Sequence, residues 1–123
     1  MILADTSVWI DHLRRGDAEL SSLLNAGQIV THPFVIGELA LGNLQNRKIV
    51  LDALASLPQV TLASNDEVLG FIDRLSLFGR GIGFIDAHLL AAVRLTPGVS
   101  LWTRDKRLLA ESARLGLGMN LTH

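Results

Sequence analysis

Apolar positions follow two spacings along the chain, and each spacing predicts a different kind of element. Nearly continuous apolar runs of four or five residues predict short strands that are buried on both faces. They lie at residues 1–5, 28–31, 60–63 and 99–103, with a possible fifth strand at 118–121. Apolar residues three and four apart predict helices between these strands. The helical stretches are residues 6–13, 18–25, 34–44, 47–57, 65–78, 84–95 and 106–115.

The residues between these runs predict where helices begin. Thr6 or Ser7 is expected to cap the first helix, Pro33 to open the third, and Ser64 or Asn65 to cap the fifth. Regular alternation of strands and helices is typical of an α/β protein with a central parallel sheet, here of about five strands, covered by helices on both faces. Such sheets bind ligands at the carboxyl ends of their strands.

Composition narrows the class of protein. The 123 residues are 49% hydrophobic and 19% charged, which predicts one folded domain over residues 1–123. No cysteine is present, so disulfides and thiolate metal sites are excluded, and a reducing cytoplasm is the expected location. No apolar run reaches 18 residues, so we expect no membrane span, and no secretory leader is recognised at the start. The net charge of −1 argues against nucleic-acid binding through bulk charge alone.

Four acidic residues occupy unusual settings. Asp5 and Asp105 each follow a predicted strand, at the edge where the fold class binds ligands. Glu38 and Asp86 are each the sole charge in an apolar helical stretch, which predicts that both are buried. The other acids lie among polar neighbours and are expected at the surface or at helix ends, namely Asp11, Asp17, Glu19, Asp52, Asp66, Glu67, Asp73 and Glu111.

A divalent cation would explain such a set of carboxylates. A buried carboxylate without a partner costs several kcal/mol or becomes protonated. Oxygen-only ligands favour Mg²⁺ or Mn²⁺ over Zn²⁺, and such ions support hydrolysis of phosphodiesters. From spacing alone the alternative stays open that Asp5 and Asp105 only cap helices and that Glu38 and Asp86 are paired core charges.

Four ordered segments resemble a known family. They are MILADTSVWID at residues 1–11, PFVIGEL at 33–39, GFIDAHLLAA at 83–92 and WTRDKRL at 102–108. Together, and in this order over nearly the whole length, they resemble the PIN-domain nucleases, and among them the VapC-type toxins of bacterial toxin–antitoxin modules. The resemblance implies a PIN-like α/β/α sandwich with a central parallel sheet.

The resemblance also implies an activity and partners. It makes Asp5, Glu38, Asp86 and Asp105 an acidic quartet that holds Mg²⁺ or Mn²⁺ for endoribonuclease cleavage of RNA. Asp5 would be the central ligand, and Glu38 would either hold a second ion or help deprotonate water. Ser7 and Thr103 would orient the carboxylates. Expected partners are a VapB-like antitoxin and a second copy of the chain. Candidates for RNA phosphate contacts are Arg104, Lys106, Arg80, Arg14 and Arg15.

Three neighbouring residues have simpler interpretations. His88 is expected to be a packed helix histidine rather than a base, and Trp9 and Trp102 are expected in the core rather than stacked on bases. Three rival functions remain: an aspartyl phosphotransfer enzyme, disfavoured by Ser7 where a second acid is required; a noncatalytic module; and a nuclease directed at DNA.

Overall fold

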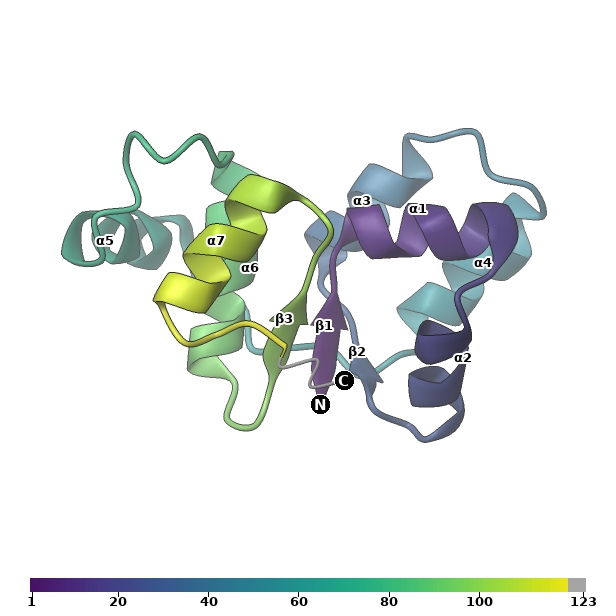
Figure 1. Cartoon of the computed structure of the whole chain (residues 1–123). Coiled ribbons are helices and arrows are strands. Elements are labelled where there is room, and N and C mark those ends of the chain that lie inside the picture. The colour runs from purple at the N-terminus through teal and green to yellow at the C-terminus, as the bar shows by residue number, and fades with distance from the viewer. Residues whose placement is uncertain (120–123) are drawn as a thin grey trace.

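A computed structural model describes residues 1–119. Strands and helices alternate in it as the spacing predicts, and a short parallel sheet lies at the centre (Figure 1). In chain order the elements are β1 (Ile2–Ala4), α1 (Thr6–Arg15), α2 (Ala18–Asn25), β2 (Ile29–Val30), α3 (Pro33–Ala40), α4 (Arg47–Ala55), α5 (Asn65–Arg74), α6 (Phe84–Leu95), β3 (Ser100–Trp102) and α7 (Lys106–Arg114).

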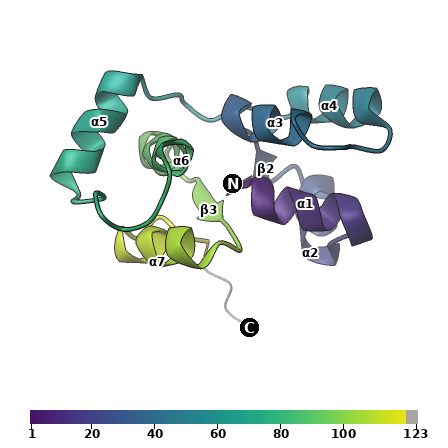
Figure 2. The same ribbon diagram turned by 90° about the horizontal axis from the view of Figure 1, so that it is seen from above.

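The first strand forms the middle of the sheet. The strand order is β2-β1-β3 and both pairings are parallel, with Leu3 opposite Val30 on one side and Leu101 on the other. Figure 2 shows three layers: α1, α2 and α7 lie on one side of the sheet, and α3 and α6 on the other, with α4 and α5 beside them. Leu3, Val30 and Leu101 are buried, as strands covered on both faces require.

The predicted number of strands is wrong, although the predicted class is confirmed. Within residues 1–119 the sheet has three strands, not about five. At the β2 edge a single pairing joins Thr31 to Gln59, after which the backbone NH of Thr61 turns to the Thr96 hydroxyl, so 60–63 form no strand. At the β3 edge Gly118 pairs with Leu101. The end of the predicted fifth strand lies outside the described residues.

Helix ends differ modestly from the predicted ones. The third helix ends at Ala40 instead of residue 44, and the fifth ends at Arg74 instead of residue 78. Beyond the fifth helix Ser76 takes the left-handed backbone conformation (φ 53°), which a continuing helix cannot contain. The apolar residues 77 and 78 that extended the predicted helix therefore belong to a loop.

The core accounts for both tryptophans and for most of α6. Trp9 and Trp102 are only 5% and 6% exposed, which confirms their prediction as core residues. All seven residues from Ala87 to Val93 of α6 are buried. In the described part of the chain no helix is long and apolar enough to cross a membrane.

One edge of the sheet collects most helix starts. The carboxyl ends of β1, β2 and β3 point to the same edge, and α1, α3, α6 and α7 begin there (Figure 1). Each helix start carries unpaired NH groups and a partial positive charge. The helix starts therefore give this edge of the sheet a partial positive charge, which favours anionic side chains there.

Candidate active site

Asp5 is the most enclosed acid at this edge. It follows β1, is 5% exposed, and forms the N-cap of α1 by accepting the Val8 NH (3.3 Å), so the predicted cap at Thr6 or Ser7 is wrong. The Ser7 and Thr103 hydroxyls donate to its two carboxylate oxygens, each at 2.5 Å. These bonds fix both oxygens in place. The structure therefore brings the two hydroxyls predicted to orient carboxylates onto Asp5.

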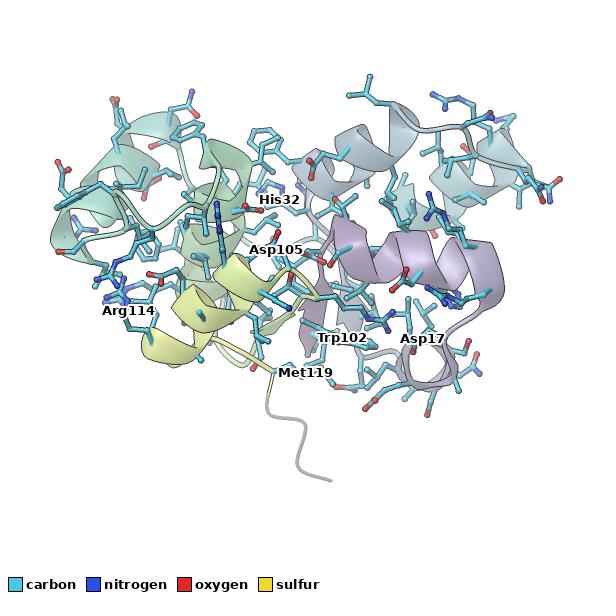
Figure 3. All side chains as sticks on the ribbon, turned by 45° about the horizontal axis from the view of Figure 1, so that its top comes forward. Asp17, His32, Trp102, Asp105, Arg114 and Met119 are labelled. Carbon is cyan, nitrogen blue, oxygen red and sulfur yellow. The ribbon has the colours of Figure 1, made fainter. Side chains whose placement is uncertain are left out.

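Asp105 lies next to Asp5 through Thr103. The Thr103 hydroxyl that donates to Asp5 also accepts the backbone NH of Asp105 (3.1 Å). Oδ1 of Asp105 caps α7 by accepting the NH groups of Arg107 and Leu108, both at 3.0 Å. Asp105 is exposed, and Figure 3 places it near the centre of the molecule. A helix cap thus aims this carboxylate at the edge of the sheet.

The pKa of Asp86 indicates that the four acids lie close together. Its Oδ2 accepts the NH of Gly83 (3.1 Å) at the start of α6, and the residue is half-buried. Burial raises the pKa of Asp86 above its usual value, the Gly83 hydrogen bond opposes this, and the charges of Asp105, Asp5 and Glu38 raise it further. All three other acids are therefore close enough to repel the Asp86 charge.

Glu38 corrects an expectation about burial. Its helix was predicted to be apolar and buried almost all round, but only Val35 and Leu39 of α3 are buried and Glu38 is exposed. The helix packs through one face, so residues on its other faces, including Glu38, are exposed to solvent. The Glu38 carboxylate accepts the Thr6 hydroxyl (2.8 Å), which ties α3 to the start of α1. From the sequence Thr6 is expected only as a helix cap, so its hydrogen bond to Glu38 is not predicted.

None of the four acids forms an ion pair in residues 1–119, whereas other acids do. Arg104 binds both Asp11 and Asp17. Glu111, predicted at the surface, is instead buried and paired with Arg114 at 2.8 Å. The alternative that Glu38 and Asp86 are paired core charges therefore does not describe the structure of residues 1–119.

The predicted RNA-contacting residues lie in different settings. Arg104 is held by its two carboxylates, its backbone NH donates to the Ser7 hydroxyl (2.9 Å), and its guanidinium lies 5.8 Å from the Trp102 ring centre. Arg80 donates to the carbonyl of Ser76 (3.2 Å). Lys106 and Arg14 are exposed. Arg104 therefore anchors the loop that carries Thr103 and Asp105 to α1 and α2.

The donor set suits Mg²⁺ or Mn²⁺ by its chemistry. Asp5, Glu38, Asp86 and Asp105 offer oxygen atoms alone, their charges are mutually repulsive, and no cation of the described chain balances them. In residues 1–119 no group of three or more acidic or histidine side chains could by itself hold an ion as placed. Mg²⁺ characteristically keeps several waters and needs only one or two protein carboxylates. The residues fit such an ion when water completes its coordination.

Comparison with known proteins assigns the chain. The family model for the PIN domain matches residues 2–114, which include all four acids. The chain belongs to the PIN-domain family. Two curated relatives, both called Ribonuclease VapC32 and from the CDC 1551 / Oshkosh and ATCC 25618 / H37Rv strains of Mycobacterium tuberculosis, are each 52% identical to it over 119 residues. The match covers 97% of this chain and 96% of each relative, so the predicted resemblance to VapC-type ribonucleases is confirmed.

Beside the acids, this PIN domain has an open hollow of about 540 Å³. It lies between α1, α3 and the loop that leads to α4, and Glu38 and Arg14 line it together with apolar side chains such as Ile10, Leu13 and Leu39. The hollow therefore joins an apolar surface to a free carboxylate of the quartet.

Two histidines lie buried beside the PIN-domain acids. His88 is 3% exposed and its Nε2 is 3.0 Å from Oδ1 of Asn65, which confirms the prediction of a packed histidine. His32 caps α3 by accepting the Phe34 NH (3.0 Å). Burial, helped by the nearby His88, lowers the pKa of His32 to about 4, and burial also lowers that of His88. Both rings are thus neutral at neutral pH.

Asp86 makes stability depend on pH when metal is absent. Because its pKa is higher in the folded chain than in the unfolded chain, Asp86 favours folding at a pH below its unfolded value of about 3.9, and this contribution is lost as the pH rises through the raised value. We expect Asp86→Asn in EDTA to melt at a higher temperature than the parent at pH 7. The difference should narrow as the pH falls toward 4, as measured by circular dichroism.

Asp17 provides a control of opposite sign. The Leu20 NH and then Arg104 lower the pKa of Asp17, so its charge favours folding above the unfolded pKa. Asp17→Asn should therefore melt at a lower temperature than the parent at pH 7. An Asp86→Asn variant that also melts lower at pH 7 would contradict the proposed repulsion among the four acids.

Proposed function

We propose that this PIN domain is a Mg²⁺- or Mn²⁺-dependent endoribonuclease that acts as the toxin of a toxin–antitoxin pair and cleaves RNA with a metal-activated water. The observation that carries the proposal is the convergence of four carboxylates that no cation of the described chain balances. The relatives of the same length that are called ribonuclease support the substrate class. We extend the proposal to residues 1–123 as a single domain that works in the cytoplasm.

The four acids have different roles in this proposal. Asp5 is the central ligand, Asp86 and Asp105 complete the metal site directly or through water, and Glu38 holds a second ion or accepts a proton from the attacking water. A bound divalent ion supplies charge neutralisation for the phosphodiester and lowers the pKa of a water molecule. The exposure of Glu38 supports a role near solvent, because its carboxylate can change rotamer without unpacking the core.

The residues around Asp5 keep its carboxylate in one orientation. The Ser7 hydroxyl and the Val8 NH donate to its Oδ1, and the Thr103 hydroxyl donates to its Oδ2. A preoriented anion avoids reorganisation when the ion and substrate bind.

For RNA phosphate contacts we retain Lys106, Arg14 and Arg80 as proposals. Arg104 is a weaker candidate for direct contact, because two carboxylates already bind its guanidinium. For the partner, we propose that a VapB-like antitoxin segment occupies the hollow beside Glu38 and presents a basic side chain to the acids. A homodimer also remains proposed, and the exposed Leu41 after α3 and the exposed Ile49 on α4 offer apolar surface for it.

Incubation with matched RNA and single-stranded DNA tests the proposed activity. A random-sequence RNA pool and its DNA counterpart, each end-labelled, are mixed with the purified chain in Mn²⁺ or in EDTA. We expect fragments from RNA in Mn²⁺ alone, because the uncompensated carboxylates require a cation before they can bind a phosphate. Intact RNA in Mn²⁺ would contradict the nuclease proposal, and cleavage of DNA alone would favour the DNA-directed alternative.

A further inference from the structure

Two phenylalanines stand exposed beside the acids, and the sequence interpretation gave them no role. Phe34 is 38% exposed at the start of α3, and Phe84 is 46% exposed at the start of α6. Large apolar side chains at a helix start next to charged groups lose the benefit of burial. The structure shows instead that both belong to one organised arrangement of rings.

His88 joins the two phenylalanines. Its ring centre lies 4.8 Å from that of Phe34 at an interplanar angle of 66°, and 4.8 Å from that of Phe84 at 90°. Tilted and perpendicular contacts at this spacing are the favoured geometries of aromatic pairs. Because Asn65 binds Nε2 of the buried His88, the central ring has a fixed orientation. The three rings therefore form a rigid, partly exposed surface, here called the aromatic platform.

The aromatic platform touches the acidic cluster through both of its helices. Phe34 lies one turn before Glu38 and on the same side of α3, about 6 Å along the axis. Phe84 lies two residues before Asp86, whose charge interacts with the other three acids. The buried ring of His32, the N-cap residue of α3, lies with its centre 5.0 Å from that of Phe34. Each exposed phenylalanine therefore shares the first turns of a helix with one of the acids.

We propose that Phe34 and Phe84, held in place by the buried ring of His88, form a stacking site for an unpaired nucleobase of single-stranded RNA, adjacent to the phosphate bound at the acidic cluster. The proposal rests on the proposed nuclease function. Every base offers an apolar face to an exposed aromatic ring, and stacking of this kind tolerates many sequences. RNA recognition commonly displays unstacked bases in this way.

The overall charge of the chain makes base stacking important for RNA affinity. A net charge of −1 provides little general attraction for RNA, and the four acids repel phosphates until a cation binds. Contacts that do not depend on charge therefore add affinity beyond that of the bound cation and the proposed basic contacts. The predicted alternatives for stacking, Trp9 and Trp102, are buried and cannot serve.

Binding measurements on a cleavage-deficient background test the platform. The full chain carrying Asp5→Asn is titrated in Mn²⁺ against fluorescein-labelled 20-mers, one of oligoadenylate and one of abasic ribose phosphate. Phe34→Leu and Phe84→Leu are each expected to raise the Kd for oligoadenylate about tenfold, within the range known for loss of one stacked base, and to leave the abasic 20-mer unchanged. Phe34→Tyr and Phe84→Tyr should restore the parent Kd.

Leu62→Ala is the matched control. Leu62 is 46% exposed and follows Thr61, whose NH binds Thr96 beyond the C-terminal end of α6, whereas Phe84 lies at the start of that helix, so substitution of Leu62 should not change either Kd. If a leucine variant fails to fold, the two Kd values of the parent are compared instead. The parent should bind oligoadenylate about tenfold more tightly than the abasic 20-mer. Equal affinity of the parent for both oligomers overturns the proposal.

Two further results separate this proposal from other interpretations. Leucine variants that bind both oligomers like the parent but change the mass measured by light scattering would make the rings a protein contact, which overturns the stacking site. If the nuclease proposal alone is wrong, binding still depends on the bases, but the unmodified chain does not cleave RNA. Cleavage by the unmodified chain with unchanged Kd in the leucine variants rejects the platform alone.

Discussion

We expect Asp5→Asn to lower the rate of RNA cleavage in Mn²⁺ about a hundred- to a thousandfold while the fold is retained. Asn keeps nearly the same shape and is as good an N-cap as Asp, so its side-chain oxygen can still accept the Val8 NH. It removes the negative charge at the most enclosed position of the acidic cluster. Loss of one preorganised electrostatic contact in an active site typically has an effect of this size.

Single-turnover cleavage of the random RNA pool, together with thermal melting, measures both halves of this expectation. Asp52→Asn is the matched control, because Asp52 is an exposed acid on α4 that pairs with Lys48 (2.9 Å) and takes no part in the acidic cluster. It should cleave RNA at the parent rate. Full activity in Asp5→Asn would show that Asp5 is a helix cap and no more, which was the alternative that the sequence left open.

The second large effect concerns stability and needs no substrate. We expect Mn²⁺ at a hundred times its Kd to stabilise the folded chain by about 2.7 kcal/mol, because an ion that binds only the folded state shifts the equilibrium by mass action. For a domain of this size that corresponds to a rise of roughly 10 °C in melting temperature. The physical source is neutralisation of carboxylate charge that burial, and then repulsion among the acids, disfavours, as the raised pKa of Asp86 reflects.

Differential scanning fluorimetry with Mn²⁺, Mg²⁺ and EDTA measures this shift. Asp86→Asn should gain little from Mn²⁺, because one ligand and part of the repulsion are already absent, and Asp52→Asn should gain as much as the parent. A parent chain whose melting temperature does not respond to either ion would contradict the metal site, whatever its activity in a cleavage assay.

Helix capping and metal binding prove compatible at this edge. Asp5 and Asp105 cap α1 and α7, and Asp86 accepts an NH at the start of α6. Capping uses Oδ1 of Asp105 and Oδ2 of Asp86 and leaves their other oxygens without a hydrogen bond in the described residues. Three helix starts stabilise negative charge that would otherwise repel. The helix caps that the structure shows therefore do not exclude the proposed metal site.

Predicted and observed elements differ where local pattern and tertiary contacts compete. The spacing of apolar residues located all seven helices of residues 1–119, since amphipathic periodicity reflects a local rule. It overestimated the sheet, because the apolar run at 60–63 reads as a strand whether or not a partner strand is available. Only Gln59 and Gly118 reach the sheet edges, one pairing each.

The sequence by itself determined the class of fold, the four acids and the family, because each is written in local pattern or in ordered motifs. Only the tertiary structure decided which groups meet. Thr103 reaches Asp5 across 98 positions because β1 and β3 pair in register, and Thr6 reaches Glu38 because α3 packs beside α1. Exposure of Glu38, capture of Arg104 by two carboxylates and assembly of the aromatic platform likewise depend on packing between distant segments, which no local spacing specifies.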